Sequence, residues 1–324
     1  MRRLIECVPN FSEGRRTDVI DALAGAIAAT PGTHLLDRSS DTDHNRTVLT
    51  FAGPPREVAD AMERMVAIAL KSIDMERHTG QHPRMGAVDV IPFVPLGDTS
   101  LDETVALAGE FSQRIAERFE LPVYLYAMAA TRPERRVLAD VRRPQYEGLK
   151  ALIADDPERA PDFGPSRLHP TGGAVAVGAR PFLIAYNINL ASEDVALAKR
   201  IAGAVREKGG GLPRVQALGL YLEDLRCAQV SMNLLDYAVT PIWQVWERVR
   251  DLAAAEGAEL RESELIGLAP LAALLAVADH AAVPSEGTDE ERITGAAHWL
   301  RIRDFEPTKA LELRLARAEG GSDA

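Results

Sequence analysis

The same order of predicted elements occurs twice in this chain of 324 residues. Hydrophobic periodicity and turn residues predict strand, helix, strand, strand, helix, strand over residues 3–96, and the same six elements again over residues 181–270. A unit with this order folds as a split βαβ layer, in which helices cover one face of a sheet. The sequence therefore predicts an α+β fold of two tandem βαββαβ-type (split βαβ) subdomains, with a ligand groove between them.

The length suggests two domains, and the pattern predicts subdomains over 1–181 and 182–300, followed by a C-terminal helix and tail over 301–324. In the first subdomain, strands are expected at 3–8, 33–40, 46–53, 87–96 and 122–127, and helices at 15–29, 54–73 and 101–119. A segment rich in Arg, Pro, Asp and Gly follows, with a helix-like piece at 132–143 and a loop at 161–180. In the second subdomain, strands are expected at 181–190, 214–224, 228–237 and within 258–270, and helices at 192–207 and 241–257.

Charge and composition disfavour several classes of protein. The net charge of -11 disfavours general binding to nucleic acid or to anionic membranes, since both reward a basic surface. No apolar run reaches the roughly 18 residues of a membrane span, and the apolar part of the N-terminus is too short for a signal peptide. Only two cysteines occur, Cys7 and Cys227, so we expect neither a disulfide framework nor a cysteine-rich metal site. A cytoplasmic protein without a nucleic acid or membrane partner is expected.

A polar loop with the sequence RHTGQHPRMG, residues 77–86, precedes an apolar run that is typical of a buried strand. Its two histidines have the i,i+4 spacing of a helical metal pair, but Gly80 and Pro83 disfavour a helix, so no metal site is predicted. A histidine titrates near neutrality, and catalytic groups favour loops held by a rigid scaffold. His82 is therefore a candidate general acid or base, and Arg84 a candidate anion ligand. The alternative is a histidine in a surface loop.

Two other polar segments are candidates for ligand binding. The segment DTDHNRTVLTF, residues 41–51, places Asn45 and Arg46 at the start of a strand of the same sheet, and its alternative reading is a solvated β-turn. The segment FGPSRLHPTGG, residues 163–173, fits neither the dinucleotide fingerprint nor a phosphate-binding P-loop. Its glycines would let a flat or anionic ligand approach the backbone N–H groups, and the alternative is an interdomain linker.

Several stretches taken together are similar to one known family. They are ECVPNFSEG near the N-terminus, NRTV at 45–48, FAGPP at 51–55, IDMERHTGQHPRMGAVDVIPF at 73–93, PVYLY at 122–126, APDFGP at 160–165, NINL at 187–190 and QVSMNLLD at 229–236. On these residues the chain resembles the formiminotransferase family, the glutamate formimidoyltransferases, over about residues 1–280. The animal members are fused to a cyclodeaminase, of which this sequence has no counterpart, so a stand-alone transferase is expected.

The resemblance implies transfer of the formimino group from N-formimino-L-glutamate to N5 of tetrahydrofolate, giving 5-formiminotetrahydrofolate and L-glutamate. It implies tetrahydrofolate as a co-substrate bound in the groove between the subdomains, no metal, and a homodimer. The histidine of the HPRMG motif is the general base of the family, which places this role on His82. The folate-contacting loop corresponds to Gly164, Pro165, Ser166, Arg167, Leu168, His169, Pro170, Thr171, Gly172 and Gly173.

Position and residue type suggest further contacts to these substrates. Both substrates carry glutamate carboxylates, so Arg46 and Arg84 are predicted to bind them through charge-assisted hydrogen bonds. Asn10, Asn187 and Asn189 stand near the ends of the matching first strands of the two subdomains. We predict that their amides contact the pterin or the amidine.

Three alternatives stay open on the sequence. The first is a transferase that uses N-formylglutamate and gives 5-formyltetrahydrofolate, since the two donors differ only by O in place of NH. The second is a folate-binding or storage protein without turnover, which has no need of His82. The third is a regulatory module of tandem βαββαβ units, which leaves the run RHTGQHPRMG unexplained.

Overall fold

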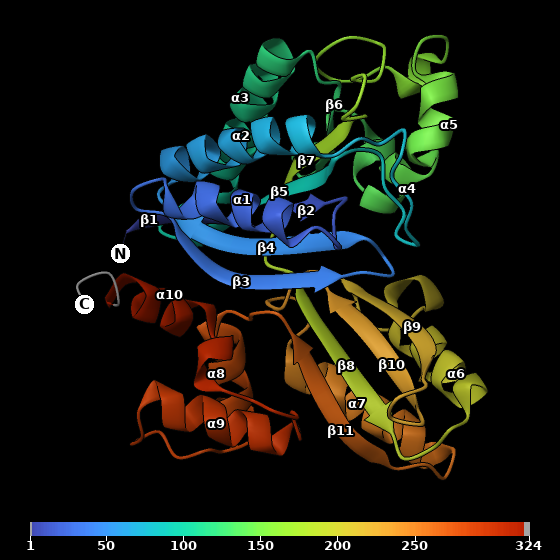
Figure 1. Cartoon of the computed structure of the whole chain (residues 1–324). Coiled ribbons are helices and arrows are strands. Elements are labelled where there is room, and N and C mark those ends of the chain that lie inside the picture. Colours follow the sequence, from blue (N-terminus) through green and yellow to red (C-terminus); the bar gives the residue numbers. More distant parts are fainter. Residues whose placement is uncertain (1, 321–324) are drawn as a thin grey trace. The chain divides into compact units, whose positions relative to one another are not determined.

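The structure of the protein is a computed structural model that describes residues 2–320 (Figure 1). It divides into two compact units, Met1–Arg180 and Pro181–Ala324, each with its own sheet and hydrophobic core. The predicted mixture of helices and strands is confirmed, with ten α-helices among the described residues, and the two units are compatible with the predicted subdomains. Residues 321–324, the end of the predicted tail, lie outside the described residues.

The first unit is built on one seven-stranded sheet. Its strands are β1 (Arg3–Cys7), β2 (Asn10–Phe11), β3 (His34–Asp41), β4 (Arg46–Gly53), β5 (Val88–Gly97), β6 (Val123–Ala127) and β7 (Val175–Ala179). Strands β3, β4, β1 and β5 pair antiparallel in that order, and the short β2 joins β4 and β5 beside β1. Strands β7 and β6 continue the sheet from β5 in parallel pairing.

Helices cover both faces of this sheet. They are α1 (Thr17–Ala28), α2 (Pro55–Ser72), α3 (Leu101–Phe119), α4 (Leu138–Arg142) and α5 (Gln145–Leu152), with 3₁₀ turns at Pro133–Arg135 and Pro157–Arg159. Helices α1, α2 and α3 pack on one face through the main core, and Figure 1 shows α1 and α2 side by side there. Helices α4 and α5 pack through a second cluster that includes Tyr124, Val141 and Leu149. Helix α3 begins at a capping box formed by Ser100 and Glu103.

Strand β7 is the main difference from the sequence prediction in this unit. The prediction of a loop at 161–180 is wrong for residues 175–179, which form a strand. All five residues are buried because β7 lies between β5 and β6, in parallel with both. A strand covered on both faces shows no alternation of polar and apolar residues, so the periodicity does not reveal it.

The second unit is a four-stranded antiparallel sheet. Its strands are β8 (Ile184–Leu190), β9 (Val215–Leu222), β10 (Cys227–Leu234) and β11 (Leu260–Ile266); its helices are α6 (Val195–Val205), α7 (Ile242–Ala255), α8 (Leu271–His280), α9 (Asp289–Trp299) and α10 (Leu311–Gly320), with 3₁₀ turns at Glu207–Gly209 and Pro307–Lys309. The strand order β11-β8-β10-β9 corresponds to β5-β1-β4-β3 in the first unit. Helix α8 was not predicted from the sequence.

Apolar and polar side chains alternate along β8 and lie on opposite faces of the sheet. Tyr186 and Ile188 are fully buried in the core beneath the helices. Asn187 and Asn189 therefore project to the opposite face of the sheet, because successive residues of a strand point to opposite sides.

Gly86→Ala should destabilise the first unit by about 1–3 kcal/mol, because the new methyl group would overlap backbone atoms. A Cβ at this position would stand 2.6 Å from the carbonyl oxygen of Gly172 and still closer to that of Ala174. Urea denaturation followed by circular dichroism measures the change, since all three tryptophans of the chain belong to the second unit.

Gly25→Ala is the matched control, because Gly25 lies on the exposed side of α1 with nothing within 4 Å of its added Cβ. This variant should gain about 0.5–1 kcal/mol from its higher helix propensity. Equal stability of the two variants would show that the close approach at Gly86 does not constrain the fold.

Candidate functional site

Two glycines hold the polar loop of residues 77–86 against neighbouring backbone. A Cβ added to Gly80 would collide with the carbonyl oxygen of His44, in the turn before β4. A Cβ added to Gly86 would collide with the glycine-rich loop before β7, at the carbonyl oxygen of Gly172. The polar loop is therefore fixed on both sides of His82 by close packing that a side chain would prevent.

Hydrogen bonds reinforce this packing. The N–H of Ala87 donates to the carbonyl of Gly172 at 2.9 Å, and the N–H of Gln81 donates to the turn before β4 at 3.2 Å. From the N-terminal segment, the hydroxyl of Ser12 donates to the carbonyl of Gly86 at 2.7 Å. The motif ECVPNFSEG thus helps to hold the loop that carries the histidines.

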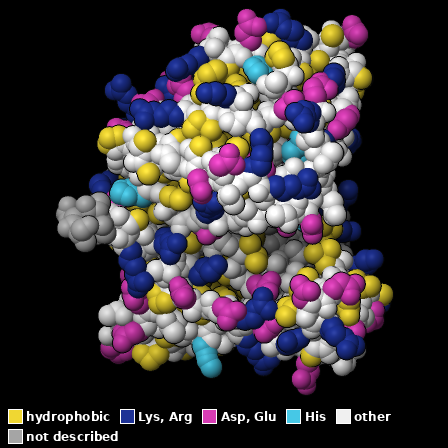
Figure 2. Space-filling view, viewed as in Figure 1, with side chains coloured by type: hydrophobic (Ala, Val, Ile, Leu, Met, Phe, Trp, Pro, Cys, Tyr) yellow, Lys and Arg dark blue, Asp and Glu magenta, His cyan; other side chains and the backbone are white. Residues whose placement is uncertain are grey.

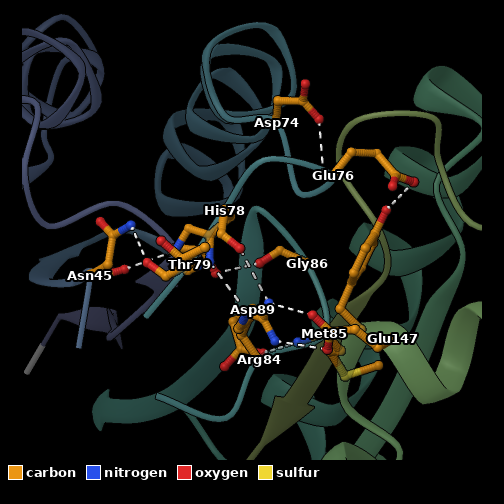
Figure 3. A network of polar contacts seen from close by, with 12 residues as sticks. Asn45, Asp74, Glu76, His78, Thr79, Arg84, Met85, Gly86, Asp89 and Glu147 are labelled. Atoms are coloured by element: carbon orange, nitrogen blue, oxygen red, sulfur yellow. Dashed lines mark hydrogen bonds and ion pairs between the residues drawn. The ribbon is translucent and has the colours of Figure 1, made fainter. Parts of the chain in front are cut away.

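Asn45 connects the turn before β4 to the polar loop. It has a φ of 49°, a left-handed conformation that Asn tolerates better than most residues. Its side-chain amide donates to the carbonyl of Thr79 at 2.9 Å, and its Oδ1 accepts from the N–H of Gly14 at 2.8 Å. The backbone carbonyl of Asn45 accepts from Nε2 of His78 at 3.2 Å (Figure 3). Asn45 is therefore a buried structural residue, not part of a solvated turn.

Arg84 is bound inside the first unit, between the polar loop and α5. Its guanidinium makes two hydrogen bonds to the carboxylate of Glu147, at 2.7 and 3.0 Å, and its Nε donates to Nδ1 of His78 at 3.2 Å (Figure 3). Because Nδ1 of His78 accepts, the proton of this neutral ring is on Nε2. Burial, with the charge of Arg84, lowers the pKa of His78. Arg84 is only 7% exposed, so it would have to leave Glu147 to bind a substrate.

His82 lies beside a buried ion pair. Its Nε2 is buried, has no hydrogen-bond partner, and stands 3.9 Å from Oδ2 of Asp89. Asp89, on β5, pairs with Arg142 of α4 and accepts a hydrogen bond from the N–H of Met85 at 2.9 Å. The ring of His44 approaches that of His82 edge-on, with 6.4 Å between centroids.

Burial and nearby cations keep His82 neutral. Desolvation lowers the pKa of His82 most, and the charges of Arg46, Arg142 and His44 lower it further, to about 3. Arg46, at the start of β4, also donates to Oδ1 of Asn10 at 3.2 Å. The ring of His82 therefore keeps a nitrogen lone pair throughout the neutral pH range and can accept a proton, as a weaker base than a free imidazole.

The glycine-rich loop is stabilised by its own histidine. Nδ1 of His169 accepts from the N–H of Gly172 at 2.9 Å and of Thr171 at 3.3 Å, and the N–H of Gly173 donates to the carbonyl of His169 at 3.2 Å. These three N–H groups are already occupied within the loop. Of the predicted loop residues, Gly164, Ser166, Arg167 and Pro170 are exposed, Pro165, Leu168, His169 and Thr171 are half-buried, and Gly172 and Gly173 are buried.

In the second unit, Asn187 and Asn189 have different surroundings. Asn189 is fully buried, donates to Glu262 at 3.1 Å and accepts from Gln229 at 2.8 Å. Asn187 accepts from the N–H of Met232 at 3.3 Å and lines a surface cavity of about 530 Å³. The cavity is also lined by residues 221–225, Gln229, Glu264 and Arg303.

The sequence analysis missed two residues that contact the His82 site. Asp89 is the lone charge in the apolar run AVDVIPFVP, which is a usable signal because a buried carboxylate requires a partner. Arg142 has no such signal, since RPERRVLADVRR contains several equivalent arginines. Of the predicted residues, Arg46 acts electrostatically on His82 and holds Asn10 by a hydrogen bond, while the two asparagines of β8 belong to the second unit.

Other kinds of site have little support in the described residues. Within residues 2–320, no group of three or more His, Cys, Asp or Glu side chains could hold a metal ion. Cys7 and Cys227 are buried free thiols. None of the described helices has the length and apolar character needed to cross a membrane. On the face shown in Figure 2, Lys and Arg side chains are interspersed with Asp and Glu rather than gathered in one patch.

Comparison with known proteins identifies both units. A family model described as "Formiminotransferase domain, N-terminal subdomain" matches residues 4–180, and one described as "Formiminotransferase domain" matches residues 185–308. The glutamate formimidoyltransferase of Thermoplasma acidophilum is 45% identical over 317 residues, 97% of this chain and 98% of that protein. The glutamate formimidoyltransferase of Streptococcus pyogenes serotype M1 is 42% identical over 280 residues, 86% of this chain and 93% of that protein.

A longer relative matches over one part of its length. The formimidoyltransferase-cyclodeaminase of Rattus norvegicus is 46% identical over 280 residues, which are 85% of this chain and 52% of that protein. Among solved structures, the match to the periplasmic protease PqqL from Escherichia coli has a TM-score of 0.18 at 10% identity, covers 98% of this chain and 40% of that chain, and carries no argument.

Acidification should destabilise the wild type more than a His82→Gln variant. The folded state holds His82 neutral down to a pKa of about 3, while the unfolded chain takes up a proton near pH 6.5. Stability from this group is therefore complete above pH 6.5 and is lost as the pH falls towards 3. Between pH 7 and pH 4, the free energy of unfolding measured by urea denaturation should fall by about 3 kcal/mol more in the wild type than in His82→Gln.

His298→Gln is the control, because His298 is exposed and lies on α9 of the second unit. It should lose as much stability on acidification as the wild type does. The same loss in His82→Gln would contradict a neutral, desolvated His82.

Proposed function

The chain belongs to the formiminotransferase family, and we infer from this premise that it is a glutamate formimidoyltransferase. It transfers the formimino group of N-formimino-L-glutamate to N5 of tetrahydrofolate, giving 5-formiminotetrahydrofolate and L-glutamate. Tetrahydrofolate is thus a co-substrate. The support is the match of family models to both units and the identity of 42–45% to two relatives of that name over most of their length.

The reaction requires one proton to leave and one to arrive. N5 of tetrahydrofolate forms a bond to the amidine carbon of the donor and loses its proton. The bond between that carbon and the glutamate nitrogen then breaks, and the departing amine takes up a proton. We propose that neutral His82 accepts the first proton and, as the imidazolium, returns it to the amine, so that the enzyme ends unchanged. No covalent bond to the protein is needed.

The observation that carries this role is the environment of His82. The side chain is 17% exposed, so it can meet a substrate, yet burial and neighbouring cations lower its pKa to about 3. A neutral imidazole that is held in a fixed loop can accept a proton without first losing one. Holding the two substrates in register beside it supplies a further, large part of the acceleration.

We propose that Arg46 binds the carboxylates of the substrates. Arg46 is half-buried near His82, and its guanidinium has one hydrogen bond, to Asn10, among the described contacts. Arg84 shares its donors between Glu147 and His78, so we assign it the task of orienting the polar loop. Asn10 then positions Arg46 as well as offering its own amide.

The remaining predicted contacts to folate are assigned by the solvent exposure of each residue. We propose that folate meets the exposed and half-buried residues of the loop Gly164–Gly173, and that Asn187 offers its amide from the cavity that it lines. Asn189 is held by Glu262 and Gln229, and so supports that surface from beneath. The split βαβ layering, the groove between the subdomains, the boundaries at 181 and 300, the homodimer, the cytoplasmic setting and the absence of a metal stay predictions.

Initial rates test the proposal directly. Tetrahydrofolate is combined with formiminoglutamate or, separately, with formylglutamate, for the wild type, His82→Ala and the exposed control His298→Ala. The wild type and the control should turn over formiminoglutamate, and His82→Ala should lose on the order of 10²–10⁴-fold in kcat while it keeps its affinity for folate.

Other outcomes would change the assignment. Turnover with formylglutamate alone would move the function to a formyltransferase that makes 5-formyltetrahydrofolate. Folate binding without turnover of either donor would leave a binding protein. Undiminished turnover in His82→Ala would remove His82 from the chemistry.

A further inference from the structure

A buried carboxylate faces the catalytic histidine without touching it. Asp89 is 1% exposed on β5, and its Oδ2 stands 3.9 Å from Nε2 of His82. This is about 0.7 Å beyond the usual upper limit for an N–H···O hydrogen bond. Nε2 is buried and has no other partner, although buried polar atoms are nearly always hydrogen-bonded. The site therefore contains a donor and an acceptor that a small movement would join.

We propose that Asp89 is a positioning residue for His82, which accepts a hydrogen bond from Nε2 and so leaves Nδ1 as the nitrogen that exchanges the substrate proton. Arg142 is the counter-charge that keeps the Asp89 carboxylate ionised. This inference rests on the proposed role of His82 as the acid and base of the transfer.

The tautomer of His82 follows from this geometry. A neutral imidazole carries its proton on one nitrogen and accepts with the other. A carboxylate beside Nε2 favours the proton there, which leaves the lone pair on Nδ1. When Nδ1 then takes the proton of N5, Asp89 stabilises the imidazolium until the amine departs. Catalytic hydrogen bonds often shorten only when the substrate is bound, which is consistent with a gap in the free enzyme.

Asp89 depends on Arg142 to remain an acceptor. Burial raises the pKa of Asp89, while the ion pair with Arg142, the N–H of Met85 and the charge of Arg46 oppose that rise. A protonated Asp89 would donate a hydrogen bond to Nε2 and move the proton of His82 to Nδ1. Arg142 therefore acts on the histidine through the carboxylate.

The charged and titratable groups around His82 come from four places. They are Asp89 on β5, Arg142 on α4, Arg46 on β4 and His44 in the turn before β4. In the part of the chain that the structure describes, Asp89 is the one acidic group within 4.0 Å of the ring nitrogens. The direct effect of removing the Asp89 charge is therefore to lower the pKa of His82, and that of removing the Arg142 charge is to raise it, whereas both changes favour the Nδ1–H tautomer. The tautomer of His82 is the readout that a purely structural ion pair would not set, because such a pair acts on the ring only through its charges.

The experiment uses the full chain labelled with ¹⁵N-histidine, with His82→Gln to assign the His82 resonances. Nitrogen shifts at pH 7 report the tautomer, and their pH dependence reports protonation. The variants are Asp89→Asn, Arg142→Gln and the double variant. Arg143→Gln is the control for Arg142, since Arg143 is exposed and pairs with Asp140. Asp162→Asn is the control for Asp89, since Asp162 is a buried carboxylate paired with Arg135.

The wild type should show Nε2–H and no protonation between pH 5 and 8. Asp89→Asn should populate Nδ1–H and lose on the order of 10²-fold in kcat with unchanged folate affinity. Arg142→Gln should raise the pKa of His82 by about 1–3 pH units. The pKa of His82 in the double variant should lie nearer the wild-type value. The controls should change neither the tautomer nor the pKa of His82.

A His82 tautomer that is unaltered in Asp89→Asn, or a His82 titration that is unaltered in Arg142→Gln, would overturn the inference. If Asp89→Asn does not fold, the tautomer of His82 in Arg142→Gln decides, since loss of Arg142 should move the ring proton to Nδ1 through Asp89. The spectra do not depend on turnover, so this inference and the proposed function can fail separately. Transfer that requires His82 together with unmoved resonances would leave the function standing and remove only the positioning role.

Discussion

The close approach of backbone segments at Gly86 is the constraint on which the site depends. There the start of β5 meets the loop before β7, and the hydroxyl of Ser12 donates to the Gly86 carbonyl from the N-terminal segment. Gly80 makes a similar approach to the turn before β4. Because the polar loop is fixed on both sides of His82, this residue is presented from a rigid position although it lies in no helix or strand.

The surroundings of His82 are cationic, although the chain as a whole is acidic. The net charge is -11, yet the charges of Arg46 and Arg142 lower the pKa of His82. Buried charges interact more strongly than exposed ones because solvent screens them less. A local cationic environment can therefore receive substrates that carry carboxylates while it keeps the histidine neutral. The single opposing carboxylate, Asp89, then decides which ring nitrogen holds the proton.

Much of this fold can be predicted from the sequence, because most strands and helices expose one face and so show a clear period. The parallel strand β7 cannot, since both of its faces are buried. At the site, His82 is visible from its loop and motif, and Asp89 from its apolar surroundings. The roles of Arg84 and Arg142 depend on which carboxylates the fold brings near them. Glu147 is 63 residues from Arg84, a pairing that no local pattern reveals.

Chemical rescue of a His82→Gly variant by added imidazoles tests the central claim most directly, because it asks whether an imidazole is the missing acid and base. The account predicts that imidazole restores transfer from formiminoglutamate to tetrahydrofolate, and that the restored rate follows the basicity of substituted imidazoles. A variant that binds folate normally but either transfers at the wild-type rate without imidazole, or gains nothing from any imidazole of suitable size, would contradict it.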